Sequence, residues 1–204
     1  MDRLLCIRCG DSIHPDTAAR HAGQCVPCSR GGQGSTRERQ EKRAKARAQE
    51  RERRASPEWR YWSSLIDRVY HQPAGFEALP RSDQLYYLVN VLSGEVHNGG
   101  FDQFFSNTSG DRYAQTVSAL EELGAHEIQG MLQEAKQCLF GEEDVPRSQT
   151  ERYRLMASAS EDGAVCMRAE AVLDRLDKRF QARADDVGEL LTQLARQHGL
   201  YPVD

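Results

Sequence analysis

The sequence predicts an all-α protein, in which a multi-helix globular domain follows a small cysteine-rich knuckle and a basic helical linker. Residues 57–201 repeat apolar side chains at helical spacing, and no stretch among them alternates as a half-buried strand would. The first 29 residues hold four of the six cysteines. The intervening chain is rich in charged helix formers. We therefore divide the chain into residues 1–29, 30–56 and 57–204.

The knuckle has the spacing Cys6-x2-Cys9-x15-Cys25-x2-Cys28. Two Cys-x-x-Cys turns supply the tetrahedral set of four thiolates that zinc prefers. A segment this short has no hydrophobic core of its own, so a bound metal supplies its folding energy. We expect one structural Zn²⁺ at these four cysteines, and residues 1–29 to form a zinc knuckle.

Two other uses of the cysteines are a disulfide pair and a redox Cys-x-x-Cys site. A reducing compartment disfavours the first, and the lack of a βαβ pattern disfavours the second. His14 and His21 lie between the pairs and are able to replace a cysteine, although four thiolates already fill the coordination sphere. Such a closed site serves nucleic-acid binding and protein docking equally well, and the sequence leaves that choice open.

A glycine-rich joint at residues 30–35 precedes the linker. Residues 36–55 are almost entirely Arg, Lys, Glu, Gln and Ala, with acid-first pairs such as Glu50 and Arg54. Because no apolar stripe exists, this segment is predicted to be a solvated helical spacer or a disordered tether.

The linker carries a ladder of arginines at Arg39, Arg43, Arg47 and Arg51, with Arg54 close behind. In a helix, this i+4 spacing lines guanidinium groups along one side, where they are able to follow a phosphate backbone. The alternative is a spacer partly neutralised by its glutamates. The second interpretation is favoured because no aromatic residues interleave to stack on bases.

The helical domain begins at Ser56-Pro57, with serine as N-cap and proline at the first helical position. Ser82 is predicted to cap a second helix, which Asn98-Gly99-Gly100 ends before a short aromatic turn at residues 101–105.

Further helices are predicted to end at Gly124, Gly141 and Gly199. Thr150 is expected to cap a short helix whose apolar residues include Tyr153. The long helix that follows has its stripe at Val165, Ala169, Val172, Leu173, Leu176 and Phe180.

Hydrophobic residues make up 39% of the chain and charged residues 28%, which suits a soluble core with much polar surface. No apolar run reaches 18 residues, so no membrane span is predicted. The N-terminal sequence lacks the apolar region of a secretory signal, and we expect a cytoplasmic protein.

Charge is distributed unevenly. Residues 1–60 hold 14 Lys/Arg and 8 Asp/Glu, whereas residues 61–204 hold 13 and 23. A basic arm joined to an acidic body indicates either two functional surfaces or an arm that folds back onto the body. Charge alone does not choose between them.

Glu95, His97 and Asp102 attract attention as possible catalytic groups. However, Glu95 and His97 are two residues apart and point to different faces of a helix. No set of nucleophile, base and orienting group can be assembled, so no catalytic residue is predicted and the protein is expected not to be an enzyme.

Residues 86–107 read YYLVNVLSGEVHNGGFDQFFSN. This stretch resembles the signature of a bacterial DNA-mimic-protein family, that of DNA mimic protein nineteen: a hydrophobic helix, then Glu-Val-x-Asn-Gly-Gly-Phe-x-Gln-Phe-Phe-x-Asn. Residues 119–125 and 176–180 are similar to two later family elements, Ala-Leu-x-x-Leu-Gly-Ala and Leu-Asp-x-x-Phe. The motif residues of structural or interaction interest are Glu95, Asn98, Gly99, Gly100, Phe101, Gln103, Phe104 and Phe105.

The resemblance covers about residues 60–200 and implies an all-α fold and a homodimer. In the family's namesake, acidic side chains imitate DNA phosphates and occupy a transcription factor's DNA-binding surface. The knuckle and the linker lie outside the family pattern. Because B-DNA carries one charge per about 1.7 Å of axis, a mimic needs its carboxylates in ordered rows.

We therefore expect a non-enzymatic interaction or regulatory protein whose acidic helical domain binds a basic protein partner, as a DNA mimic binds a DNA-binding protein. The alternative is a nucleic-acid-binding protein that uses the knuckle and linker, with the helical domain for dimerisation or regulation. Carboxylates in two rows favour the first hypothesis, and a continuous basic face over knuckle and linker favours the second.

Overall fold

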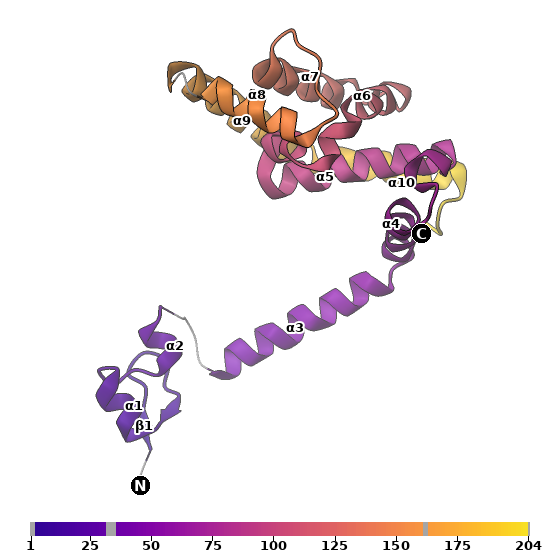
Figure 1. The fold of residues 1–204 in the computed structure, drawn as a ribbon. Helices are drawn as coiled ribbons and strands as arrows, with labels where there is room; N and C mark the ends of the chain where they lie inside the picture. Colours follow the sequence, from indigo (N-terminus) through magenta and orange to yellow (C-terminus); the bar gives the residue numbers. More distant parts are fainter. Residues whose placement is uncertain (1–2, 32–35, 161–162, 204) are drawn as a thin grey trace. The chain divides into compact units, whose positions relative to one another are not determined.

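The computed structural model describes residues 3–31, 36–160 and 163–203, excluding the side chains of residues 36–37, 158–160 and 163–168. The chain forms two compact units, Met1–Trp59 and Arg60–Asp204. The predicted all-α class is confirmed, since helices account for nearly all of the regular structure described (Figure 1). No described helix is both long and apolar enough to cross a membrane.

The knuckle is a small ββαα arrangement around its cysteines. Its elements are β1 Leu4–Leu5, β2 Ser12–Ile13, α1 Pro15–Arg20 and α2 Val26–Ser29. The two strands pair antiparallel, and sequence reasoning missed them because two residues are too few to show alternation. A separate small core is buried here, made of Cys6, Ile13, Ala18, Cys25 and Cys28.

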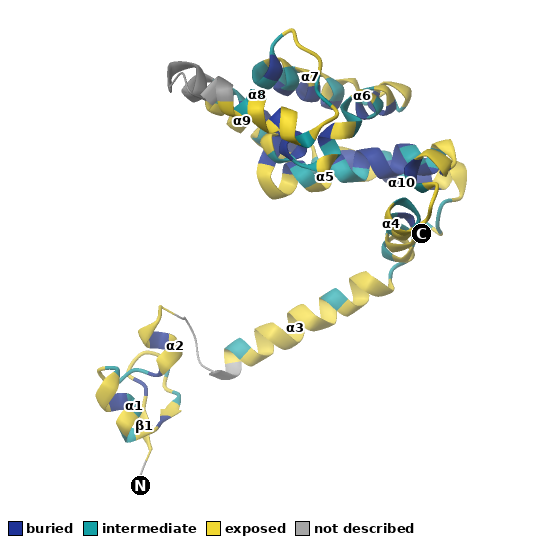
Figure 2. Ribbon diagram, in the orientation of Figure 1, coloured by how far each residue is buried: buried dark blue, intermediate teal, exposed yellow. Residues whose placement is uncertain are grey.

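The linker is helical as α3, Thr36–Ala55, rather than disordered. Its described side chains are exposed almost throughout (Figure 2), as the missing apolar stripe predicts. Glu50 forms ion pairs with Arg53 at 2.9 Å and with Arg54 at 2.6 Å. Residues 32–35 of the glycine-rich joint lie outside the described residues.

The second unit is built from helices joined by short connections. They are α4 Pro57–His71, η1 Gly75–Ala78, α5 Arg81–Ser106, η2 Thr108–Arg112, α6 Tyr113–Glu122, α7 His126–Phe140, α8 Gln149–Ser160, α9 Gly163–Gln181 and α10 Ala184–His198. The predicted glycine stops are confirmed, because Gly124, Gly141 and Gly199 follow helices with φ of 69°, 56° and 61°.

The start of α4 is as predicted from Ser56-Pro57. The Ser56 hydroxyl accepts the Trp59 backbone N–H at 3.1 Å and so satisfies one of the free donors at the helix start. Further along α4, the Trp62 ring stacks on the Tyr87 ring of α5 at 5.9 Å between centroids. This aromatic contact anchors α4 to the core of the second unit.

Helix α5 is the centre of the second unit and contacts α6, α9 and α10 (Figure 1). Two predictions for it are wrong. It begins directly after Pro80 without a side-chain cap, so Ser82 is not its N-cap. Nor does it end at the glycine pair: Gly99 (φ −155°, ψ 22°) and Gly100 (φ 76°, ψ −176°) bend the chain, and the predicted aromatic turn continues as helix.

The motif phenylalanines form part of the core. Phe101, Phe104 and Phe105 are each at most 1% exposed. The predicted short helix is present as α8, but it begins at Gln149, so Thr150 lies inside it and is not its cap. Tyr153 is 53% exposed, whereas Arg152, beside it, is completely buried. The side chain of Val165, an expected core position, lies outside the described residues.

Candidate metal centre and binding cavity

The four knuckle cysteines lie together, as their spacing predicts. The Sγ atoms of Cys6, Cys9, Cys25 and Cys28 are all within 4.8 Å of one another. The Cys9 and Cys25 sulfurs are 3.7 Å apart. A tetrahedral site with metal–sulfur bonds of about 2.3 Å has sulfur–sulfur edges of about 3.8 Å, so this cluster has the size of a four-thiolate metal centre.

The surroundings of the cluster shift the pKa values of its thiols in opposite directions. Burial disfavours the Cys6 thiolate, but backbone N–H groups, that of Cys25 first among them, outweigh burial and lower the Cys6 pKa to about 6. At Cys9 the Asp11 N–H favours the thiolate, yet burial and the neighbouring sulfurs together raise the pKa to about 12. Four thiolates this close repel one another, and a divalent cation removes that repulsion.

The two histidines of the knuckle stand apart from the cluster. The exposed His14 is the N-cap of α1, and its Nδ1 accepts the Asp16 backbone N–H at 3.3 Å. His21 closes the other end of the same helix through its backbone. In the part of the chain that the structure describes, the group placed to hold a metal consists of the four cysteines.

The arginine ladder of α3 is only partly available. Arg39 pairs with Asp11 of the knuckle at 3.4 Å, and Arg54 pairs with Glu50. The other members, Arg43, Arg47 and Arg51, are exposed, and no carboxylate among the described residues pairs with them. Three guanidinium groups on successive turns therefore face solvent.

The glycine bend of α5 is explained by a residue of α9. Asp177 accepts the Phe101 backbone N–H at 2.8 Å and so caps the helical segment that follows the bend. A Cβ on Gly100 would lie 2.2 Å from the Asp177 Oδ2 atom, in addition to the strain of its positive φ. The Phe180 ring packs edge-on against Phe101 at 5.7 Å. The motif and the Leu-Asp-x-x-Phe element thus meet in space.

The position of Asp177 beside the bend disfavours the charged form of its carboxylate. Burial raises its pKa above the ordinary value, and the hydrogen bond from Phe101 only partly opposes that rise.

The polar motif residues converge on one carboxylate. Glu95 Oε2 accepts the Gln103 amide at 2.6 Å and the Asn107 amide at 2.8 Å. Its Oε1 is 3.2 Å from the Ser109 hydroxyl, which also reaches the Phe104 carbonyl at 2.9 Å. Asn107 and Ser109 were not predicted as site residues, although Asn107 ends the recognised stretch.

The remaining motif positions have plainer roles. Gly99 lies beside the Gln103 side chain, whose Oε1 would be 2.2 Å from an added Cβ. Asn98 is exposed in the turn before the bend. Glu95 and His97 do point apart, as predicted: His97 packs its ring against Phe180 at 5.7 Å.

A cavity of about 600 Å³ opens beside this carboxylate, within the second unit. Helices α4, α5 and α6, the short helices η1 and η2, and the loop before α8 contribute its walls. Polar side chains that line it include Tyr70, Tyr87, Glu95, Ser109, Arg112 and Arg147.

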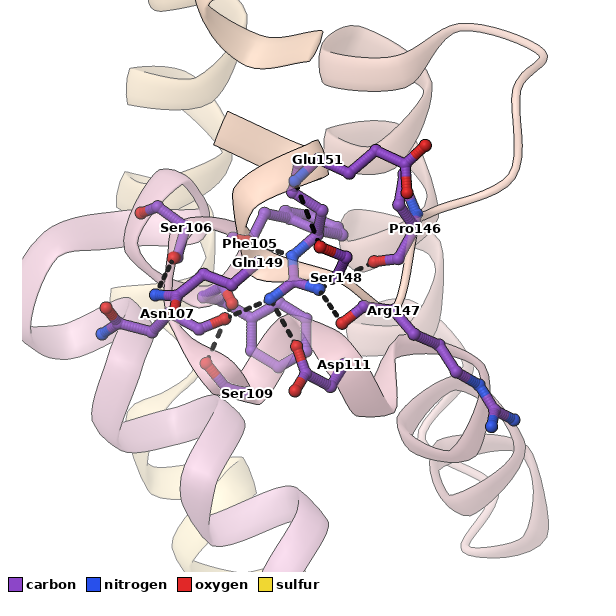
Figure 3. Close-up of polar contacts among 12 residues, drawn as sticks. Phe105, Ser106, Asn107, Ser109, Asp111, Pro146, Arg147, Ser148, Gln149 and Glu151 are labelled. Carbon is purple, nitrogen blue, oxygen red and sulfur yellow. Dashed lines mark hydrogen bonds and ion pairs between the residues drawn. The ribbon is translucent and has the colours of Figure 1, made fainter. Parts of the chain in front are cut away.

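Arg152 of α8 holds one side of this cavity in place, and its partners Phe105, Asn107, Pro146, Arg147 and Asp111 are labelled in Figure 3. Its guanidinium donates to the Phe105 and Asn107 carbonyls, both at 2.7 Å. It also donates to the Pro146 and Arg147 carbonyls, at 2.7 and 2.9 Å. An ion pair with Asp111 at 2.6 Å completes its contacts. One buried cation thereby ties the end of α5, η2 and the loop before α8 together.

These observations define a class of protein: an all-α domain with a polar cavity, preceded by a cysteine cluster placed for a metal ion. The family model described as DMP19-like protein matches residues 77–198, and the chain belongs to this family. The resemblance to DNA mimic protein nineteen is thereby confirmed. No curated protein and no solved structure shows a significant match to the chain.

Proposed function

We propose that the protein is a non-enzymatic interaction protein whose acidic helical domain binds a basic partner in the manner of a DNA mimic. Family membership, combined with the 23 acidic against 13 basic residues of positions 61–204, carries this proposal. A negative surface attracts the positive DNA-binding surface of such a partner and steers its approach.

The carboxylates that serve this purpose are those without an internal cation. Several acidic residues are already neutralised by arginine, such as Glu122 by Arg81 and Glu127 by Arg183. Surface carboxylates of the second unit that have no ion pair among the described residues include Glu121, Glu143, Asp144, Asp185 and Glu189. These five are the proposed phosphate mimics.

The test is capture followed by competition with DNA. Residues 57–204, which include the whole second unit, are immobilised and exposed to a lysate of the organism of origin. A DNA-binding partner of a mimic is released by duplex DNA, because DNA occupies the same surface.

The matched comparison uses two sets of substitutions. Neutralising Glu143, Asp144 and Glu189 to the amides is expected to abolish capture. Neutralising the ion-paired Glu122, Glu127 and Asp174 changes net charge equally and is expected to preserve it. Equal loss from both sets contradicts the assignment, and a captured protein that DNA fails to release contradicts mimicry.

We further propose that the cysteine cluster binds one structural Zn²⁺, in a protein that works in the reducing cytoplasm and assembles as a homodimer. The four-sulfur donor set and its tetrahedral size support zinc. Metal analysis of protein purified without chelators tests the first point, and light scattering during size-exclusion chromatography tests the last.

A second candidate function is nucleic-acid binding by the first unit. The exposed Arg43, Arg47 and Arg51 on one helix favour it, because no carboxylate in the described part of the chain pairs with them. Three phosphate contacts predict a log–log salt slope of about −3 for duplex DNA. Titration of the full chain and of an R43Q/R47Q/R51Q variant measures this slope, and identical weak binding by both contradicts the ladder's role.

A further inference from the structure

The cavity beside Glu95 lies outside the proposed mimicry and has its own chemistry. Its volume of about 600 Å³ is within the range of small-molecule sites and far exceeds the needs of one water molecule. Part of its wall is apolar, formed by Val69, Leu88, Val91 and Phe104. A cavity of this kind accommodates an organic molecule with an apolar portion.

Glu95 is a half-buried carboxylate in the wall of this cavity, and no cation among the described residues forms an ion pair with it. Its three partners, Gln103, Asn107 and Ser109, are neutral donors. Two amides occupy Oε2, whereas Oε1 is contacted by Ser109, whose single proton is shared with the Phe104 carbonyl. The carboxylate is therefore held in one orientation by neutral donors, with Oε1 open to a further donor.

The other acidic groups of the cavity are already paired. Glu77 accepts from Arg112 at 2.9 Å, and the Arg112 guanidinium also lies 3.8 Å above the centre of the Phe76 ring. Asp111 is held by Arg152. These pairs are fixed within the protein, which leaves Glu95 as the lining carboxylate without a cation among the described residues.

Arg147 supplies the opposite charge at the same cavity. Its side chain is exposed and points away from the other labelled residues in Figure 3, while its carbonyl accepts from Arg152. The charge of Arg147 adds slightly to the lowered pKa of Glu77, which the hydrogen bond from Arg112 mainly causes. However, its guanidinium forms no ion pair with a described residue.

We propose that this cavity binds a small zwitterion of the α-amino-acid class. The ligand's ammonium group donates to Glu95 Oε1, its carboxylate pairs with Arg147, and its side chain lies on the apolar wall. An ammonium group suits Glu95 better than a guanidinium does, because a fork-shaped donor needs both carboxylate oxygens and Oε2 is taken. The motif residues Gln103 and Asn107 position Glu95 for this contact.

Calorimetric titration of the full-length protein tests the proposal with three kinds of probe: the individual protein amino acids, n-butylamine and butyrate. At least one amino acid is expected to bind more tightly than either singly charged probe. Glu95→Gln is expected to weaken that binding about tenfold or more, and Arg147→Gln about threefold or more, because each removes one charge-assisted contact.

Control variants distinguish an effect on the cavity from a general effect of removing a surface charge. Glu121→Gln and Arg154→Gln alter exposed residues that have no ion pair among the described residues and do not line the cavity, so binding should be unchanged. Val91→Phe narrows the cavity without touching either charge and should abolish binding of all probes. If Glu95→Gln does not fold, Arg147→Gln and Val91→Phe still decide the matter.

Three results overturn the proposal. One is that no amino acid binds at millimolar concentration. Another is that n-butylamine equals the best amino acid and that Arg147→Gln leaves amino-acid binding unchanged, which indicates a site for a lone cation such as a partner's lysine side chain. The third is binding that survives Val91→Phe. Each outcome is independent of DNA-displaceable capture by the acidic surface.

Discussion

Replacement of Arg152 by methionine tests whether this buried cation holds the end of α5, η2 and the loop before α8 together. Arg152 is completely buried, and it donates five hydrogen bonds or ion-pair contacts of 2.6 to 2.9 Å. Methionine fills similar space but donates nothing. The Phe105 carbonyl then loses its guanidinium donor inside the core, while the carbonyls of Asn107, Pro146 and Arg147 and the carboxylate of Asp111 are only partly buried.

The expected loss of stability depends on how many of these acceptors can bind water once the guanidinium is gone. Charged hydrogen bonds contribute about 1.5–3 kcal/mol each, but four of the five acceptors are able to rehydrate in part. We therefore expect a loss of about 3–5 kcal/mol in the free energy of unfolding, the range for removing one partner of a buried ion pair. That amount is a large fraction of the stability of an ordinary domain.

Urea unfolding followed by circular dichroism at 222 nm measures the change, and tryptophan fluorescence reports separately on α4, which contains Trp59 and Trp62. Arg154→Met is the matched control, since Arg154 is exposed two residues further along the same helix, and a change within about 0.5 kcal/mol is expected. A loss below about 1 kcal/mol for Arg152→Met would refute the claim that this cation ties the cavity wall together.

Three further predictions concern the glycine bend, the cysteine cluster and the response to alkali. Gly100→Ala should destabilise the protein by about 1–3 kcal/mol, because its Cβ meets Asp177, whereas Gly94→Ala in an open helical position should stabilise it by about 0.5–1 kcal/mol, both read by urea unfolding. Cys28→Ser should abolish stoichiometric zinc in metal analysis and leave the thermal unfolding of the second unit unchanged; retained zinc contradicts the ligand assignment. Burial raises the pKa of Tyr87 in the folded protein above its value in the unfolded chain, which is about 10. The protonated phenol therefore contributes its full stability below about pH 10, and this contribution is lost as the pH rises further. Tyr87→Phe should reduce the pH dependence of unfolding between about pH 10 and 12, and an unaltered slope contradicts this.

The cysteine cluster and the helix ends were predictable because their signals are local. Two Cys-x-x-Cys turns bring paired sulfurs together through short-range geometry. Gly124 and Gly199 follow their helices in the left-handed region, where glycine alone avoids a Cβ clash. The family motif was also legible as a string of residues.

The bend at Gly100 shows where local reasoning fails. An Asn-Gly-Gly sequence ordinarily ends a helix, and the sequence around it contains nothing that restarts one. The restart depends on the Asp177 carboxylate, which is 76 positions away and accepts the Phe101 N–H. A cap that is supplied by a distant helix cannot be recognised from the residues next to the helix start.

By itself, the sequence determined the helical class, the basic and acidic halves, the sulfur donor set and the family motif, since each rests on residue type and spacing along the chain. The tertiary structure alone decided that Arg152, in a polar helix, is buried. It also decided that Glu95 has no cation partner among the residues described, while the neighbouring Glu77 and Asp111 are paired. The reason is physical: the state of a charge depends on which distant groups packing brings within about 4 Å of it.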